Sequence, residues 1–184
     1  MRRHYPDAIE RLLIHEEALT IPFPTEPADY ERVIRLRGTP DGALLAPAPT
    51  GDVRFVPLFR AGLFYHHNAL DDAHRLVQEA TGDAAAYWHA MIHRRERDFE
   101  NARYWLRRAG EQPSFAEMQA RASEVSSNMG RQMTWDPFLL VHLAEQLRFG
   151  AEEVRAEVVG LGRVEFEVFF DYCHRQANGV PVKP

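Results

Sequence analysis

Histidine and carboxylate side chains recur at helical spacing in the middle of this chain. His89, His93 and Glu96 stand at positions i, i+4 and i+7, so on a helix they share one face. Asp71 and His74 stand at i and i+3, and a helix over that segment would also place them on one face. Imidazole and carboxylate groups are ligands of first-row divalent metals. The spacing therefore predicts two short helical faces that could share one ion.

Two interpretations of these residues are open. If the two helices run antiparallel with these faces together, a metal-dependent enzyme, for example a hydrolase, would hold a divalent metal with His74, His89, His93, Glu96 and Asp71. The glutamate does not lie between the two histidines, so the segment is not the H-E-x-x-H motif of metalloproteases. The alternative is a packed groove in which carbonyls and nearby acids satisfy the imidazoles. A metal-free variant of the enzyme has a histidine as general base, oriented by Asp71 or Glu96.

Arginine and aromatic residues form a second dense group on the same segment. Interleaved guanidinium groups and aromatic rings suit an anionic, planar or peptide-like ligand. The pattern predicts a groove that binds a protein segment or a small anionic ligand through His89, His93, Arg94, Arg95, Tyr104, Arg107 and Arg108. The alternative is a solvated helix surface, in which Arg94 and Asp98 form an i, i+4 ion pair.

Composition narrows the classes of protein that these residues belong to. The chain has 184 residues, 45% of them hydrophobic and 27% charged, as in a globular protein. The net charge of −5 argues against nucleic acid or an anionic membrane as a partner. No apolar run reaches membrane-spanning length, and the first residues lack an apolar signal core. We therefore expect a cytoplasmic protein whose oligomeric state is open.

An internal repeat organises the segment that carries both groups. At an offset of 29 residues, small residues fall on small residues, since Ala61 aligns with Ala90 and Ala73 with Ala102. Small residues at such intervals let two helices approach closely, as in tetratricopeptide hairpins, whose unit is about 34 residues. The segment resembles that family at these positions and departs from it in period. It also departs at Arg97, where a turn glycine is usual.

The rest of the chain is expected to be helical as well. The sequence predicts one all-α domain of antiparallel helical hairpins, with a core over residues 55–177 and a frayed tail over 178–184. Residues 1–54 would add peripheral helices, the first reaching to about residue 20, and a Pro/Gly-rich loop over 39–52. Asn68 is expected to cap the helix that follows it. A helix over 151–177 would break at Gly160 and Gly162.

One stretch also resembles a known family. The run Tyr87-Trp88-His89-Ala90, followed by His93-Arg94-Arg95-Glu96, Asn101-Ala102, Tyr104-Trp105 and Arg107-Arg108, is similar to the signature of a family of uncharacterised bacterial and fungal proteins. Trp135-Asp136-Pro137-Phe138 resembles a second signature of that family. The resemblance covers about residues 61–138, with departures at Arg97 and Gln112. It implies a shared helical fold and a shared special surface, without a reaction.

These observations support three accounts of function. The first is a helical-repeat binding module whose groove is lined by histidine, arginine and aromatic side chains. The second is the metal-dependent enzyme. The third is a structural domain whose arginines stabilise an oligomer.

Overall fold

The chain folds into an all-α structure, as the sequence predicts. The computed structural model describes residues 5, 7–13, 19–45 and 50–179, and these residues contain helices and no β-strand. The first helices are α1 (Asp7–Leu12), α2 (Tyr30–Gly38), α3 (Asp41–Leu44), α4 (Phe55–His66), α5 (Leu70–Glu79) and α6 (Asp83–Arg95). They are followed by α7 (Phe99–Ala109), α8 (Phe115–Ala122), α9 (Ser127–Gly130), α10 (Pro137–Arg148), the 3-10 turn η2 (Glu152–Val154) and α11 (Arg155–Asn178).

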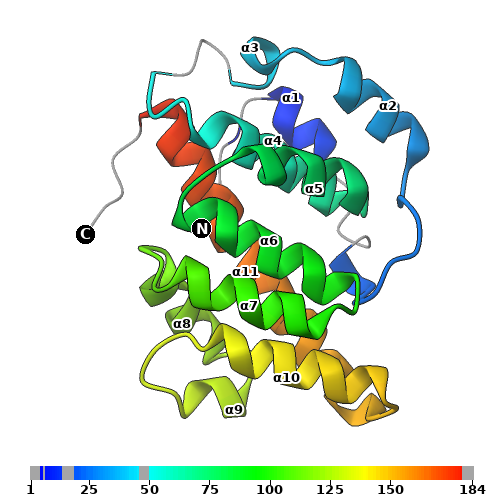
Figure 1. The fold of residues 1–184 in the computed structure, drawn as a ribbon, viewed down its shortest axis with the longest axis vertical. Helices are drawn as coiled ribbons and strands as arrows, with labels where there is room; N and C mark the ends of the chain where they lie inside the picture. The colour runs from blue at the N-terminus through cyan, green and yellow to red at the C-terminus, as the bar shows by residue number, and fades with distance from the viewer. Residues whose placement is uncertain (1–4, 6, 14–18, 46–49, 180–184) are drawn as a thin grey trace.

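Helices α4 to α7 form two consecutive hairpins that lie side by side (Figure 1). The offset of 29 residues relates their boundaries, because α4 ends at residue 66 and α6 at 95, while α5 begins at 70 and α7 at 99. The turns match as well: Asn68 and Arg97 are the two described non-glycine residues with positive φ, at 59° and 67°. Asn68 is therefore a left-handed turn residue, and its predicted capping role is wrong, since Ala69 occupies the N-cap position. A tetratricopeptide-like packing of the hairpins stays a prediction.

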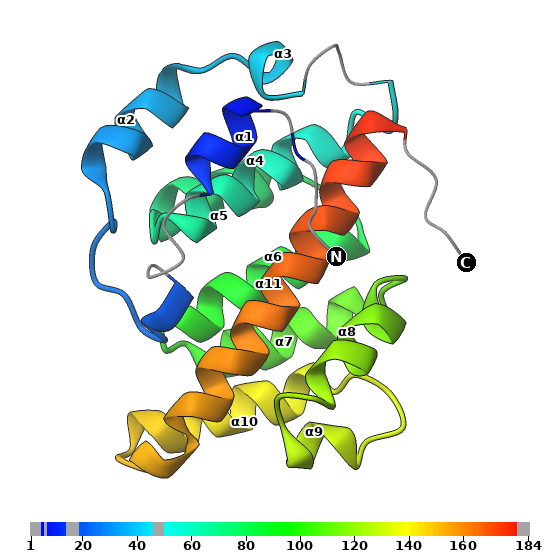
Figure 2. The same ribbon diagram turned by 180° about the vertical axis from the view of Figure 1, so that it is seen from behind.

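Helix α11 crosses behind the hairpins and holds the layers together (Figure 2). Its Phe166 and Phe169 contact the ring of Trp88, and Phe170 contacts Phe59. The Phe170 ring packs directly on the α4 backbone at Gly62, where an added Cβ would lie 2.5 Å from that ring. Packing of this kind stabilises a helix well beyond its intrinsic propensity. That explains why α11 is continuous, and why the break predicted at its glycines is wrong.

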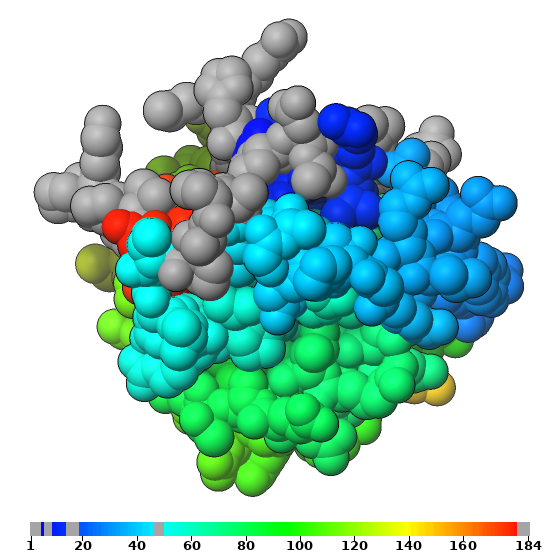
Figure 3. Space-filling view, turned by 90° about the horizontal axis from the view of Figure 1, so that it is seen from above, coloured from blue at the N-terminus to red at the C-terminus, as the bar shows by residue number. Residues whose placement is uncertain are grey.

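The N-terminal segments spread over one end of the hairpins, as Figure 3 shows from above. Helices α1 and α2 bury Ile9, Val33 and Leu36 there. The predicted loop after α2 contains the short helix α3, and residues 46–49 lie outside the described part. The predicted extension of the first helix falls on residues 14–18, and most of the predicted tail on 180–184, which are also outside it.

None of the described helices is long and apolar enough to cross a membrane.

Candidate metal centre

Three of the five predicted ligands converge between α5 and the end of α6. One ligand atom from each of His74, His93 and Glu96 lies within 4.8 Å of the other two. Nδ1 of His93 is 3.1 Å from Oε2 of Glu96, and Nδ1 of His74 is 3.7 Å from Oε1 of the same carboxylate. The side chains of His74 and Glu96 are 30% and 28% exposed, whereas that of His93 is 11% exposed. The group therefore has a buried histidine and an open side toward solvent.

The turn between α6 and α7 positions the carboxylate. Glu96 is the C-cap residue of α6, and Arg97 after it has the left-handed conformation that reverses the chain. The packing of α5 against α6 then brings His74 onto the same face as His93. Their rings meet edge to face, with centroids 4.8 Å apart. The i, i+3 spacing of His93 and Glu96 and the hairpin geometry thus assemble the group from two helices.

The carboxylate of Glu96 is coupled electrostatically to the two histidines. Hydrogen bonding to His74 and His93 lowers the pKa of Glu96 to about 2, although burial opposes the shift. The same contact with Glu96 raises the pKa of His74 above its usual value. Asp71 adds to this increase through its negative charge. The carboxylate is therefore ionised at neutral pH.

Asp71 lies near this group without joining it. It is exposed in the first turn of α5, and the cluster of potential ligand atoms does not include it. The carboxylate of Asp98 also lies near the group, with Oδ2 3.9 Å from Nδ1 of His93. Its main role is to cap α7, because it accepts hydrogen bonds from the backbone and the side chain of Asn101. Both acids add negative charge beside the site.

His89 packs against the cluster one turn earlier on α6. Its ring centroid lies 5.2 Å from that of His74 and 6.2 Å from that of His93. On its other side it stacks on Trp105 of α7, with centroids 4.0 Å apart and planes 9° from parallel. Burial, reinforced by the positive charge of His74, lowers the pKa of His89 to about 4. His89 is therefore a neutral imidazole at pH 7.

The arginines predicted for the binding groove separate onto other faces. Arg94 turns away from the histidines and forms a buried, bidentate ion pair with Glu165 of α11. Tyr87 donates a hydrogen bond of 2.8 Å to the same carboxylate and accepts one of 2.8 Å from Trp135. The predicted ion pair between Arg94 and Asp98 is therefore wrong, since Arg94 is engaged inside the core.

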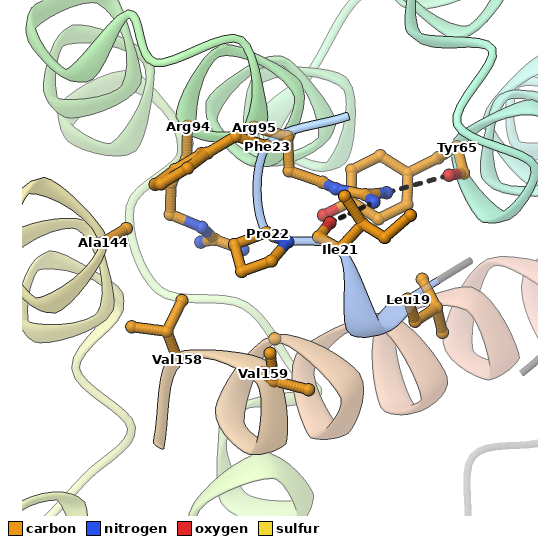
Figure 4. Close-up of a pocket in the computed structure, with 11 residues that line it drawn as sticks. Leu19, Ile21, Pro22, Phe23, Tyr65, Arg94, Arg95, Ala144, Val158 and Val159 are labelled. Atoms are coloured by element: carbon orange, nitrogen blue, oxygen red, sulfur yellow. Dashed lines mark hydrogen bonds between the residues drawn. The ribbon is translucent and has the colours of Figure 1, made fainter. Parts of the chain in front are cut away.

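Arg95 supports the backbone instead of lining an open groove. Its guanidinium donates to the carbonyls of Tyr65 and Ile21, at 3.0 and 2.9 Å (Figure 4). It also donates to Oδ1 of Asn68. Through these hydrogen bonds Arg95 connects Ile21, in the segment before α2, with the turn between α4 and α5. A pocket beside them is lined mainly by apolar side chains, including Pro22 and Val158. We therefore assign Arg95 an architectural role.

The remaining predicted binding residues lie on α7. Arg108 is exposed, and its guanidinium lies over the rings of Trp105 and Tyr104, 5.5 and 5.8 Å from their centroids. Tyr104 is 46% exposed, and Arg107 is exposed. The predicted set thus divides: His89 and His93 belong to the histidine cluster, which Trp105 connects with Arg108, whereas Arg94 and Arg95 do not.

Sequence reasoning missed two side chains that shape this region. Glu165, the partner of Arg94, is 71 positions away in a mainly apolar stretch of α11. A charged residue inside such a run is the one signal that could have flagged it as buried and paired. Trp105 stands in the Tyr104-Trp105 pair of the sequence, but its stacking on His89 depends on the α6–α7 packing, which no spacing rule specifies.

Comparisons with protein-family models, with curated proteins and with solved structures found no match to this chain. The resemblance to the bacterial and fungal family therefore stays a prediction.

Proposed function

We propose that this protein binds a first-row divalent transition metal between α5 and α6 and uses it as a metal-dependent enzyme. The observation that carries the proposal is the convergence of His74, His93 and Glu96, whose ligand atoms lie within 4.8 Å of one another. Binding an ion at about 2.0–2.2 Å from each atom would need only small adjustments of side chains at a partly open surface.

The chemistry of the three ligands indicates the class of ion. Two imidazoles and one carboxylate suit zinc, iron, cobalt or nickel, whereas magnesium and calcium prefer oxygen ligands alone. Three protein ligands leave at least one coordination position for water or substrate, the arrangement of catalytic rather than structural sites. The exposed edges of His74 and Glu96 give such a ligand access from solvent. Activation of a bound water for hydrolysis is the simplest reaction that this arrangement supports.

The groove-binding account has less support. It needs Arg94 and Arg95 to face a ligand, and both are occupied by buried contacts with Glu165 and with backbone carbonyls. Nδ1 of His93, by contrast, points at the partly exposed carboxylate of Glu96, 3.1 Å away. An imidazole and a carboxylate that converge beside solvent are both ligands that one transition-metal ion takes.

Metal titration of the purified protein tests the proposal. After removal of adventitious ions with chelator and dialysis, zinc and cobalt binding is measured by calorimetry, and bound metal by elemental analysis. We expect about one ion per chain, with affinity reduced at least 100-fold in His93→Ala and in Glu96→Gln. His142→Ala, which removes an exposed histidine of α10, is the matched control and should bind like the wild type. Equal binding by all four proteins, or none by any, would contradict the proposal.

Activity is tested separately, with chromogenic ester and phosphoester substrates. Hydrolysis that requires the added ion and is lost in Glu96→Gln supports the enzyme. Tight metal binding without any metal-dependent turnover, across such a panel, would instead favour metal storage or sensing.

A further inference from the structure

One ring nitrogen of His89 is hydrogen-bonded within α6, and the other has no donor among the described residues. Nδ1 lies 3.2 Å from the carbonyl oxygen of Ala85, one turn back on the same helix. A carbonyl only accepts, so Nδ1 carries the proton and Nε2 carries the lone pair in the neutral ring. Among the described residues, no donor reaches Nε2. Because Nδ1 is bonded to its own helix, Nε2 is the nitrogen farther from the α6 backbone.

The ring that carries this lone pair is held rigidly. Trp105 stacks on one side of it at 4.0 Å, and the guanidinium of Arg108 lies over the indole, 5.5 Å from its centroid. His74 meets the ring edge to face, so the imidazole is enclosed between α5 and α7 and is only 4% exposed. A functional histidine is preorganised in this way, by packing on its ring and by a hydrogen bond on the nitrogen that does not contact the ligand.

His89 lies next to two of the proposed metal ligands, His74 and His93. It packs on both ligand histidines, yet its nitrogens are not part of the group whose ligand atoms lie within 4.8 Å of one another. Two nitrogens bound to one ion are about 3–4 Å apart, which follows from metal–nitrogen distances of about 2.0–2.1 Å. His89 therefore adjoins the ligand histidines without being a ligand itself, which makes it a candidate partner for a molecule bound at the open position of the ion.

We infer that Nε2 of His89 accepts a hydrogen bond from the exogenous ligand of the ion, so that the site selects small ligands whose coordinating group carries a proton. The inference rests on the proposed metal site and specifies its ligand class. Water is the resting ligand of this class. A hydroxamic acid, which releases its O–H proton to solvent on coordination and keeps an N–H beside the bound oxygen, is an organic member. Azide, which coordinates without a proton to donate, gains nothing from His89.

Cobalt substitution makes this preference measurable, because the visible spectrum of bound Co²⁺ changes when its fourth ligand changes. Acetohydroxamic acid and azide are titrated separately into the cobalt-loaded wild type and into His89→Phe, whose ring preserves the stacking on Trp105. We expect unchanged cobalt and azide affinities, and about tenfold weaker binding of acetohydroxamic acid, the effect of one lost hydrogen bond. If His89→Phe does not fold, His89→Asn replaces it in the test. It also lacks an atom at the Nε2 position, and we expect the same result.

The outcomes separate this inference from the proposed function. If a folded His89→Phe no longer binds cobalt, His89 is itself a ligand, and the inference is wrong while the metal site stands. Equal weakening of both probes would mean that His89 only packs, which also overturns it. If the wild type binds no cobalt, the proposed function fails and the ligand preference fails with it.

Discussion

The two faces of α6 both carry buried polar side chains, but they differ in whether those side chains are fully hydrogen-bonded inside the protein. On one face, Arg94 and Tyr87 meet Glu165 of α11 in a buried network in which the charges are paired. On the other, no donor among the described residues reaches Nε2 of His89, and His74 and His93 share the partly exposed carboxylate of Glu96. The first face is complete as it stands, and the second is not.

This difference shows how architecture and site can be separated within one dense segment. Burial alone does not distinguish the faces, since Arg94 and His89 are each 4% exposed. What distinguishes them is whether each polar atom is satisfied inside the protein, because an unsatisfied buried group has a cost in free energy that a ligand can remove. Breaking the complete face should destabilise the fold, whereas breaking the incomplete face should change binding.

The largest expected effect is on the complete face. In Glu165→Gln the buried guanidinium of Arg94 loses its countercharge, and we expect the free energy of unfolding to fall by about 3–5 kcal/mol, measured by urea denaturation. In the wild type, burial opposes the charge on Arg94, and Glu165 raises the pKa of Arg94 above its usual value; the variant keeps the burial and loses the countercharge. The double variant Arg94→Met, Glu165→Leu removes both charges and should be more stable than either single variant. Equal stability of Glu165→Gln and wild type would contradict the assignment of this face.

The next effect is ligand-induced stabilisation on the incomplete face. Zinc at about 100 times its dissociation constant should stabilise the wild type by about 2.7 kcal/mol, because it binds only the folded state. Thermal unfolding with and without zinc measures this shift. His74→Gln should remove the shift while changing the metal-free protein little, since His74 is partly exposed. A zinc-dependent shift that persists in His74→Gln would place the ion elsewhere.

A smaller effect is the pH dependence of the metal-free protein. The pKa of His89 is about 4 in the folded state and about 6.5 when unfolded, so the unfolded state binds more protons between these values. Stability contributed by neutral His89 is therefore present above pH 6.5 and is lost as the pH falls toward 4. Between pH 7 and pH 4 the wild type should lose about 2 kcal/mol more than His89→Phe.

His74 and Glu96 also make the stability depend on pH, in opposite directions. His74, with a raised pKa, contributes stability that is lost as the pH rises through its folded value. Glu96 contributes stability that is lost below pH 4.5, as the pH falls toward about 2. Both are present in wild type and in His89→Phe, so the difference between the two proteins isolates His89. Parallel pH profiles would show that His89 is solvated.

The smallest effect concerns the turn that carries the carboxylate ligand. Arg97 has φ of 67°, which a glycine adopts without steric cost, and its guanidinium lies 5.1 Å from the ring of Phe23. Arg97→Ala loses the contact and keeps the strained backbone, whereas Arg97→Gly loses the contact and relieves the strain. We expect the glycine variant to be more stable than the alanine variant by about 1 kcal/mol, measured by urea denaturation. The reverse order would mean that the turn is not strained.

The sequence predicted the helices and their repeat because both depend on local patterns. The offset of 29 residues correctly related the two hairpins, and the departure at Arg97 marked a turn with positive φ. The break expected at Gly160 and Gly162 was wrong because long-range packing of α11 outweighs local propensity. Helical spacing also identified His74, His93 and Glu96 as possible neighbours, since they lie on adjacent helices.

What the sequence could not predict was the direction of each side chain around α6. Arg94 follows His93 directly, and a rotation of about 100° per residue places it on a different face. The spacing of Arg94 and Asp98 fitted an ion pair equally well, and only the position of α11 shows that Glu165 takes the arginine instead. The metal-binding and groove-binding sets overlapped in the sequence for this reason.

Helix α11 has a consequence for the order in which the protein folds during synthesis. It is translated after every helix that it contacts, including α4, about 100 residues upstream. The contacts within each hairpin are local, so the hairpins can form early, but the rings of Trp88 and Phe59 lack their cover until α11 emerges. A nascent chain paused before α11 would therefore expose an apolar face, and we expect it to be a substrate for chaperones.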